Sequence, residues 1–165
     1  MINYDFFEKI PYQTSIINHN ANLNIIKTFN EFIDIFSKSN LVYIITGSFA
    51  ISLLTKKVYR TWGDIDVIFV DPLHSYLKLL PVGKWYHKDF DRNRLSVFNI
   101  KNNNYIEFLK DTNKDYEKKT YIETANSIKI QNLQSILDWK NSNKINAKHS
   151  MDIAKINHNL DLNEY

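Results

Sequence analysis

The 165-residue chain contains no cysteine and no long apolar run. The absence of cysteine excludes disulfides, zinc–thiolate sites and thiol catalysis. The longest apolar stretches, Leu41–Ile45 and Val67–Val70, are too short to span a bilayer. The N-terminal residues carry early acids and lack the apolar segment of a signal peptide. We therefore expect a soluble, cytoplasmic protein without membrane contact.

A clustered basic surface is also missing. The formal net charge is only +3, and the lysines are scattered along the chain. This balance suits anionic ligands such as nucleotides and is weaker than that of a dedicated duplex-DNA binder. A hydrophobic content of 44% predicts a folded chain. The length predicts a single domain over residues 1–165, with a core at about 22–110 and a helical part at about 131–160.

The first half of the chain has the pattern of a helix, a buried strand and a second strand. Apolar residues recur at helical spacing over Leu23–Ser37, after a less regular arm of about twenty residues. The run Leu41–Ile45 predicts a buried strand, and Ser48 is then expected to cap a short helix that ends near Leu54. A loop over residues 56–63 leads to a second strand at Ile65–Val70.

The second half continues with a hairpin and closes with helices. Lys101–Asn104 has tight-turn composition, which predicts a hairpin between the strands that flank it. The predicted elements are a helix at Leu73–Leu80, strands at Arg94–Ile100, Tyr105–Leu109 and Ser127–Ile130, and helices at Leu133–Lys140 and Ala147–Leu160. This order predicts an α+β (α/β) fold in which a small mixed sheet is flanked by helices.

Asp64 and Asp66 are the first candidate site residues. Two residues apart on a strand, their side chains point to the same face. Neighbouring carboxylates stay ionised together when a cation lies between them, and Mg²⁺ takes oxygen ligands while leaving room for phosphate oxygens. The alternative is an acidic strand edge that faces solvent.

Gly47 and Ser48 come where the first strand ends. Glycine lets the backbone approach a phosphate closely, and a helix N-terminus at Ser48 favours an anion. An ordinary strand-to-helix turn would also use this pair.

Glu107 is a third acid, enclosed by apolar residues in a predicted strand. A glutamate on a buried face needs a partner. If it joins Asp64 and Asp66, the three carboxylates form a two-metal phosphoryl-transfer site. If it points outward, it is only surface charge.

These three elements resemble the signature of the DNA polymerase β-like nucleotidyltransferase superfamily. The resemblance is carried by Ile45–Ser48, by Asp64–Val67 after a fifteen-residue gap, and later by Ile106–Phe108. The spacer is similar to those of nucleotidyltransferases that modify aminoglycosides and lincosamides, and of abortive-infection-type toxins. The chain departs from many antibiotic-modifying members, because Ser48 replaces a second glycine. The C-terminal helices, with Lys148 and Asp152, resemble those that close the active-site cleft in these families.

The resemblance implies a polymerase β-like fold with C-terminal helices and an enzyme that moves a nucleoside monophosphate from an NTP to a hydroxyl acceptor, releasing pyrophosphate. It implies two Mg²⁺ ions, for which Mn²⁺ could substitute, held by Asp64, Asp66 and Glu107 as catalytic residues. ATP is a candidate donor. The resemblance implies that the nucleotide is bound by Gly47, Ser48, Arg60, Lys140 and Lys148.

Several alternatives stay open. Arg60, Lys140 and Lys148 could be surface cations, and His149 could be catalytic or a helix-surface residue. Trp62 could stack on a base or pack against the sheet. The acceptor could be a small molecule, an RNA or a protein, and a homo-oligomer is compatible with the sequence. The alternative function is a catalytically silent member of the same fold that binds a nucleotide or a partner, such as a toxin–antitoxin component.

Overall fold

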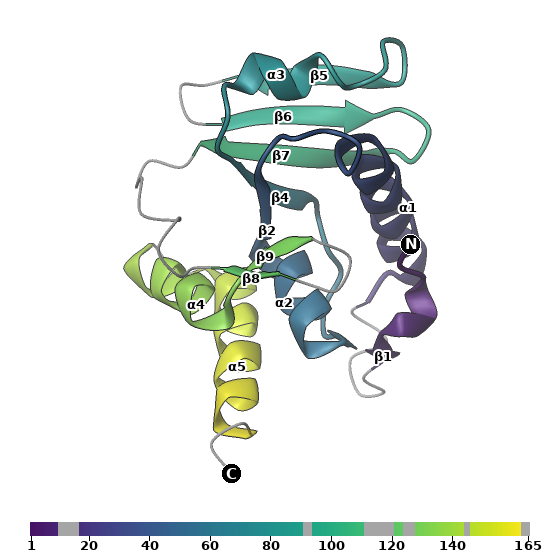
Figure 1. Ribbon diagram of the computed structural model, residues 1–165. Helices are drawn as coiled ribbons and strands as arrows, with labels where there is room; N and C mark the ends of the chain where they lie inside the picture. Colours follow the sequence, from purple (N-terminus) through teal and green to yellow (C-terminus); the bar gives the residue numbers. More distant parts are fainter. Residues whose placement is uncertain (10–16, 91–93, 111–120, 124–127, 144–145, 163–165) are drawn as a thin grey trace.

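One mixed β-sheet organises the chain in the computed structural model, which describes residues 1–9, 17–90, 94–110, 121–123, 128–143 and 146–162 (Figure 1). Among these residues the strands are β1 (Glu8–Lys9), β2 (Tyr43–Thr46), β3 (Lys57–Val58), β4 (Ile65–Phe69), β5 (Trp85–Phe90), β6 (Arg94–Asn99), β7 (Asn104–Lys110), β8 (Tyr121–Glu123) and β9 (Lys129–Gln131). The helices are η1 (Tyr4–Phe6), a 3₁₀ turn, α1 (His19–Phe36), α2 (Gly47–Thr55), α3 (Leu73–Leu77), α4 (Leu133–Ser142) and α5 (Ala147–Leu162).

Seven of the described strands form the main sheet, in the order β5-β6-β7-β4-β2-β9-β8. The pairs β2–β4, β5–β6, β6–β7 and β8–β9 are antiparallel, whereas β4–β7 and β2–β9 are parallel. The middle of the sheet is therefore β4, flanked by β7 and β2. The predicted α+β fold with a small mixed sheet and flanking helices is confirmed.

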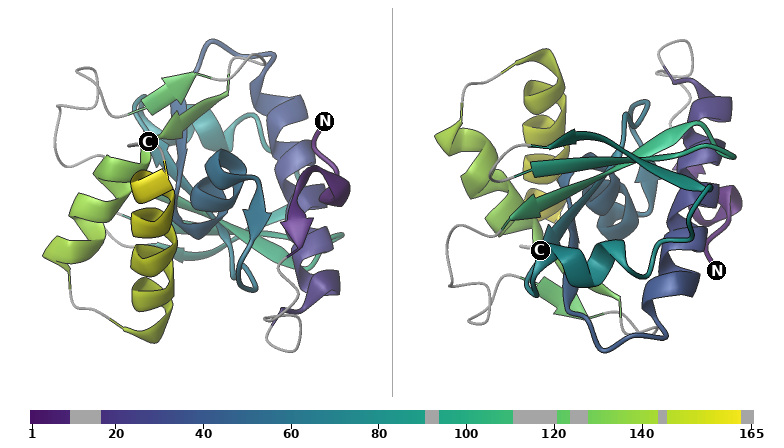
Figure 2. Two further views of the ribbon diagram at one scale, coloured as in Figure 1. Left: turned by 90° about the horizontal axis from the view of Figure 1, so that it is seen from below. Right: turned by 90° about the horizontal axis from the view of Figure 1, so that it is seen from above.

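The helices cover the sheet around the central helix α2. This helix contacts β2, β4 and β9 as well as α4 and α5. In the views of Figures 1 and 2, α2 lies between α1 and the α4–α5 pair. Side chains of α1, among them Phe29, Phe32 and Phe36, are fully buried in the core. Among the described residues, no helix is long and apolar enough to cross a membrane.

Local sequence patterns predicted most of these helices and strands, but several begin or end at other residues than predicted. The hairpin is confirmed as β6–β7, and Asn103 takes the positive φ of 53° that its turn requires. The first long helix begins at His19 rather than Leu23, because Asn18 caps it by accepting a hydrogen bond from the Ala21 amide. Helix α3 ends at Leu77, and turns continue to residue 80 before Pro81.

The predicted loop over residues 56–63 is confirmed except at Lys57–Val58, and four of its eight residues are buried. It contains β3, which pairs with β1, and the side chain of Trp62 packs against Tyr4 and Phe7 of the N-terminal arm. That arm is less regular, as predicted, since its described residues form only the 3₁₀ turn η1 and the two-residue β1, while residues 10–16 lie outside the described part. Part of the strand predicted at Ser127–Ile130 also lies outside it, and β9 covers Lys129–Gln131. Strand β5 was not predicted.

Candidate active site

Asp64 and Asp66 lie at the beginning of the central strand β4. Ile65 and Val67, between and after them, are fully buried in the core, so strand alternation turns Asp66 to the other face. Asp64 directly precedes the strand, and both aspartates are half-buried. The apolar members of the strand thus fix the direction of the two carboxylates.

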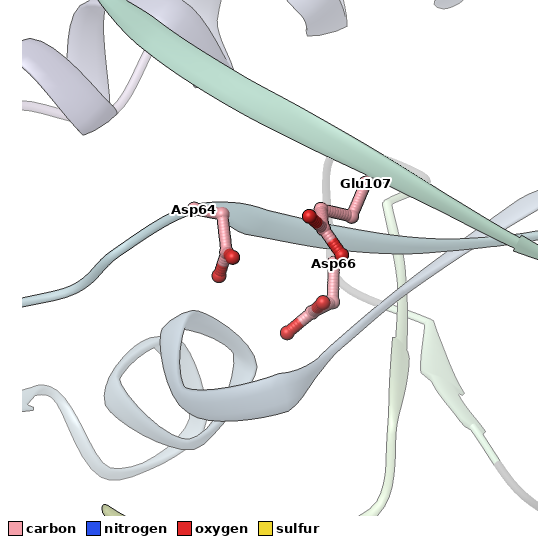
Figure 3. A group of neighbouring side chains, drawn as sticks. All are labelled: Asp64, Asp66 and Glu107. Carbon is pink, nitrogen blue, oxygen red and sulfur yellow. The ribbon is translucent and has the colours of Figure 1, made fainter. Parts of the chain in front are cut away.

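Glu107 joins the aspartates through the pairing of β4 with β7. The two strands are parallel, and Glu107 lies directly opposite Asp66 in their register. Each of Asp64, Asp66 and Glu107 offers a carboxylate oxygen, and these oxygens lie within 4.8 Å of one another. Figure 3 shows the three side chains on the same side of the two strands, the side on which α2 begins. We refer to these three residues as the acidic cluster.

The negative charges in the acidic cluster repel one another. The pKa of Asp66 rises to about 8, first through burial and then through the charges of Asp64 and Glu107. The pKa of Asp64 is also raised, by burial and by the charge of Glu107. Carboxylates this close ionise together only when a cation joins them. Because their oxygens are ligands that hard divalent ions prefer, the cluster suits Mg²⁺ or Mn²⁺.

Gly47 allows α2 to begin directly beside Asp66. Its φ is +70°, and a Cβ at this position would lie 1.9 Å from Asp66 Oδ2. Glycine is therefore required both by backbone conformation and by space. The sequence suggested that Gly47 leaves room for a phosphate, and here the space next to it is occupied by a carboxylate.

Ser48 lies inside the first turn of α2, not at its cap. Thr46 holds the N-cap position and makes no side-chain cap bond; its hydroxyl instead donates to Gln131 Oε1 on β9. Ser48 is buried. The predicted cap at Ser48 is wrong by two positions, because glycine already starts the helix. The N-terminus of α2 still faces the acidic cluster, and a helix N-terminus favours anions.

Arg60 and Lys140 are buried and pair with Asp152 of α5. Arg60 contacts both carboxylate oxygens of Asp152, at 2.8 Å (Nε–Oδ1) and 3.1 Å (Nη2–Oδ2), and Lys140 Nζ lies 2.7 Å from Oδ2. The Tyr59 hydroxyl donates to Oδ1 at 2.7 Å. Asp152 itself is fully buried. We refer to Tyr59, Arg60, Lys140 and Asp152 as the Asp152 cluster.

The Asp152 cluster acts electrostatically on the acidic cluster. Burial dominates the raised pKa values of Asp64 and Asp66, but the charge of Arg60 lowers both, and that of Lys140 lowers the pKa of Asp66. The structure therefore brings the two predicted cations near the carboxylates, although their charged atoms are bound to Asp152.

The remaining predicted residues divide between surface and core. Lys148 is exposed in the first turn of α5, and its charge lowers the pKa of Asp64 against the larger effect of burial. His149 is half-buried and meets the Trp139 ring edge-on at 5.8 Å. Trp62 is a core residue whose Nε1 donates to Ser52 Oγ at 2.9 Å, so it packs rather than stacks on a base.

Sequence reasoning missed the two residues of β6 that contact Glu107. Arg94 donates to Glu107 Oε1 in an ion pair, and Ser96 Oγ donates to the same oxygen at 3.1 Å. Ser96 lies directly opposite Glu107 in the hairpin register. The predicted turn at Lys101–Asn104 sits one residue late, and this shift would place Phe98 opposite Glu107. Correct placement of the turn was the signal that could have found Ser96.

No protein-family model and no curated protein matches the sequence. Solved structures do match. The crystal structure of ANT(2")-Ia in complex with adenylyl-2"-tobramycin aligns with a TM-score of 0.65 at 13% identity, over 82% of this chain and 88% of that chain. The lincomycin-bound lincosamide antibiotic adenylyltransferase LnuA aligns with a TM-score of 0.57 at 14% identity, over 86% and 97%.

A third match is a candidate nucleotidyltransferase from Thermotoga maritima, with a TM-score of 0.51 at 13% identity, over 71% of this chain and 83% of that chain. At such identities the likeness is one of fold. The predicted nucleotidyltransferase fold is confirmed.

Proposed function

We propose that this protein is a divalent-metal-dependent nucleotidyltransferase that moves a nucleoside monophosphate from an NTP to a hydroxyl group and releases pyrophosphate. The observation that carries the proposal is the acidic cluster, whose three carboxylate oxygens lie within 4.8 Å of one another on adjacent strands. The fold shared with ANT(2")-Ia and LnuA supports it. A nucleotide donor also accords with the cytoplasmic location expected from the sequence.

Asp64, Asp66 and Glu107 would hold the ions, Mg²⁺ with Mn²⁺ as a substitute. When bound, such ions lower the pKa of an attacking hydroxyl and neutralise the charge that develops on the phosphates. Glu107 is also a candidate general base, because its carboxylate belongs to the cluster beside which the attacking hydroxyl would bind.

The triphosphate would bind at the start of α2. Gly47 and Ser48 offer backbone N–H groups there, and the helix N-terminus favours negative charge. Lys148, exposed and close enough to act on Asp64, would contact the phosphates directly. Arg60 and Lys140 would act mainly through their charge, since Asp152 already binds their charged atoms.

For the acceptor we propose a hydroxyl of a small polar molecule. Two of the matching structures are complexes with adenylyl-2"-tobramycin and with lincomycin. This places aminoglycosides and lincosamides first among the acceptors to test, with RNA and protein as the other classes.

The direct test is Mg²⁺-dependent pyrophosphate release from each labelled NTP in the presence of antibiotics, tRNA or cell extract. We expect Asp64→Asn and Asp66→Asn each to lower the rate at least about 1,000-fold, because the carboxylates act as a unit. Asp34→Asn is the matched control, since Asp34 is exposed and forms an ion pair with Lys38 one helical turn away.

Three outcomes would contradict the proposal. Full activity in both cluster variants would show that the site is elsewhere. NTP binding without turnover on any acceptor would favour the catalytically silent alternative, a nucleotide- or partner-binding protein such as a toxin–antitoxin component. Unchanged thermal stability with Mg²⁺ and every NTP would remove nucleotide binding altogether.

A further inference from the structure

Arg94 is a cation in direct contact with the acidic cluster. It is the first residue of β6, the strand next to β7, and its guanidinium forms an ion pair with Glu107 Oε1. Ser96 Oγ donates to the same oxygen at 3.1 Å. This oxygen of Glu107 therefore has two donors already, one charged and one neutral.

All three carboxylates of the acidic cluster affect the pKa of Arg94. Burial lowers its pKa, but the hydrogen bond to Glu107 and the charges of the three carboxylates together raise it. Its side chain is 54% exposed, whereas that of Glu107 is 10% exposed. The carboxylate is thus held by the sheet, while the guanidinium reaches it from the solvent side.

Arg60, in contrast to Arg94, is buried and held in place by its partner. Its side chain is 11% exposed and is bound to both oxygens of the fully buried Asp152. Releasing Arg60 would leave a buried charge without a partner, which is costly. The ion pair between Arg94 and Glu107 is half-exposed on the arginine side, and exposed ion pairs are weak.

A divalent ion at the cluster would bind the same Glu107 carboxylate that Arg94 contacts. The two cations therefore compete for one carboxylate. Once displaced, the guanidinium would still lie beside the cluster, and guanidinium groups pair bidentately with phosphate oxygens.

We propose that Arg94 changes partner during ligand binding: it neutralises Glu107 in the metal-free protein and binds a phosphate oxygen of the nucleoside triphosphate once ions occupy the cluster. This inference rests on the proposed function. It assigns to Arg94 of β6 the phosphate contact that the sequence suggested for Arg60.

The test separates ion binding from nucleotide binding and needs no turnover. Mn²⁺ binding is measured by electron paramagnetic resonance without nucleotide, and binding of the α,β-methylene analogue of ATP is measured by calorimetry with saturating Mg²⁺. The variants are Arg94→Ala, Arg94→Lys and Ser96→Ala. Ser96→Ala is the matched control, because it removes the neutral donor to the same Glu107 oxygen.

Arg94→Ala should bind Mn²⁺ about two- to fivefold more tightly, since a competing cation is gone. The same variant should bind the nucleotide analogue about 10- to 100-fold more weakly, because a charge-assisted hydrogen bond to phosphate is lost. Arg94→Lys should keep Mn²⁺ affinity near that of the wild type and lose only part of the nucleotide affinity. Ser96→Ala should leave nucleotide affinity unchanged.

Three results would overturn the inference. If Arg94→Ala weakens Mn²⁺ binding, Arg94 only supports Glu107; if it leaves nucleotide affinity unchanged, no phosphate contact exists. If Ser96→Ala weakens nucleotide binding as strongly as Arg94→Ala does, the effect comes from displacement of Glu107. Failure of the wild-type protein to bind Mn²⁺ or the analogue would instead refute the proposed function, and this inference with it.

Discussion

The acidic cluster and the Asp152 cluster lie close together and have opposite charge balances. In the Asp152 cluster, one fully buried carboxylate is bound by Arg60, Lys140 and the Tyr59 hydroxyl. Although burial raises the pKa of Asp152, its hydrogen bonds and its cations lower it overall. In the acidic cluster the corresponding balance raises the pKa of Asp66 to about 8.

This difference separates a structural use of buried charge from a ligand-binding use. The Asp152 cluster joins α5, α4 and the segment before β4, and its carboxylate has the partners it needs within the protein. The acidic cluster has more negative charge than its neighbours neutralise. Such a site gains from an added cation, whereas the Asp152 cluster gains nothing from one.

Loss of the buried Asp152 carboxylate should give the largest change in stability. Asp152→Ala leaves Arg60 and Lys140 buried without their partner, so we expect the free energy of unfolding to fall by about 3–5 kcal/mol. Urea denaturation measures this change. Asp138→Ala, at an exposed position of α4, is the control and should change stability by less than about 0.5 kcal/mol. A similar small change in both variants would show that the Asp152 cluster is not structural.

Gly47→Ala should disturb the acidic cluster while leaving the Asp152 cluster intact. The new Cβ would meet Asp66 Oδ2 at 1.9 Å in a backbone conformation with φ of +70°. We expect a loss of about 1–3 kcal/mol in urea denaturation and weaker Mn²⁺ binding. Gly63→Ala is the control, because nothing lies within 4 Å of its Cβ and its φ is outside the left-handed region. Mn²⁺ binding that survives Gly47→Ala would contradict the close packing of Gly47 against Asp66.

The pH dependence of stability should differ in sign between the clusters, and this is the smallest expected effect. Asp66 has a folded pKa of about 8, above its ordinary value of 3.8, so it contributes stability at low pH that is lost as the pH rises toward 8. Asp152 has a lowered folded pKa, so its contribution is present above its ordinary value and is lost as the pH falls below that value.

Thermal unfolding of the metal-free protein between pH 4 and pH 9 measures the first effect. The melting temperature of the wild type should fall by a few degrees relative to that of Asp66→Asn as the pH rises, because the amide does not titrate. Saturating Mg²⁺ should remove this difference by compensating the ionised carboxylate. A constant difference between wild type and variant across the range would show that the pKa of Asp66 is ordinary.

Strand alternation and turn chemistry let the sequence predict the central part of the fold. The apolar residues Ile65 and Val67 required a core face, and this alternation alone directed Asp64 and Asp66 toward the opposite face, where the site lies. The apolar neighbours of Glu107 marked a strand in the same way. Local patterns of this kind depend on a few consecutive residues, so they survive without knowledge of the partners.

The sequence by itself thus predicted the two central strands and the face to which their carboxylates point, because each depends on the local spacing of apolar residues. Only the tertiary structure decided which cation meets which carboxylate. Asp152 lies 92 residues from Arg60, and Arg94 reaches Glu107 through a hairpin register that the sequence placed two positions away. Both pairings come from long-range packing and strand register, which is why the acidic cluster could be predicted and its partners could not.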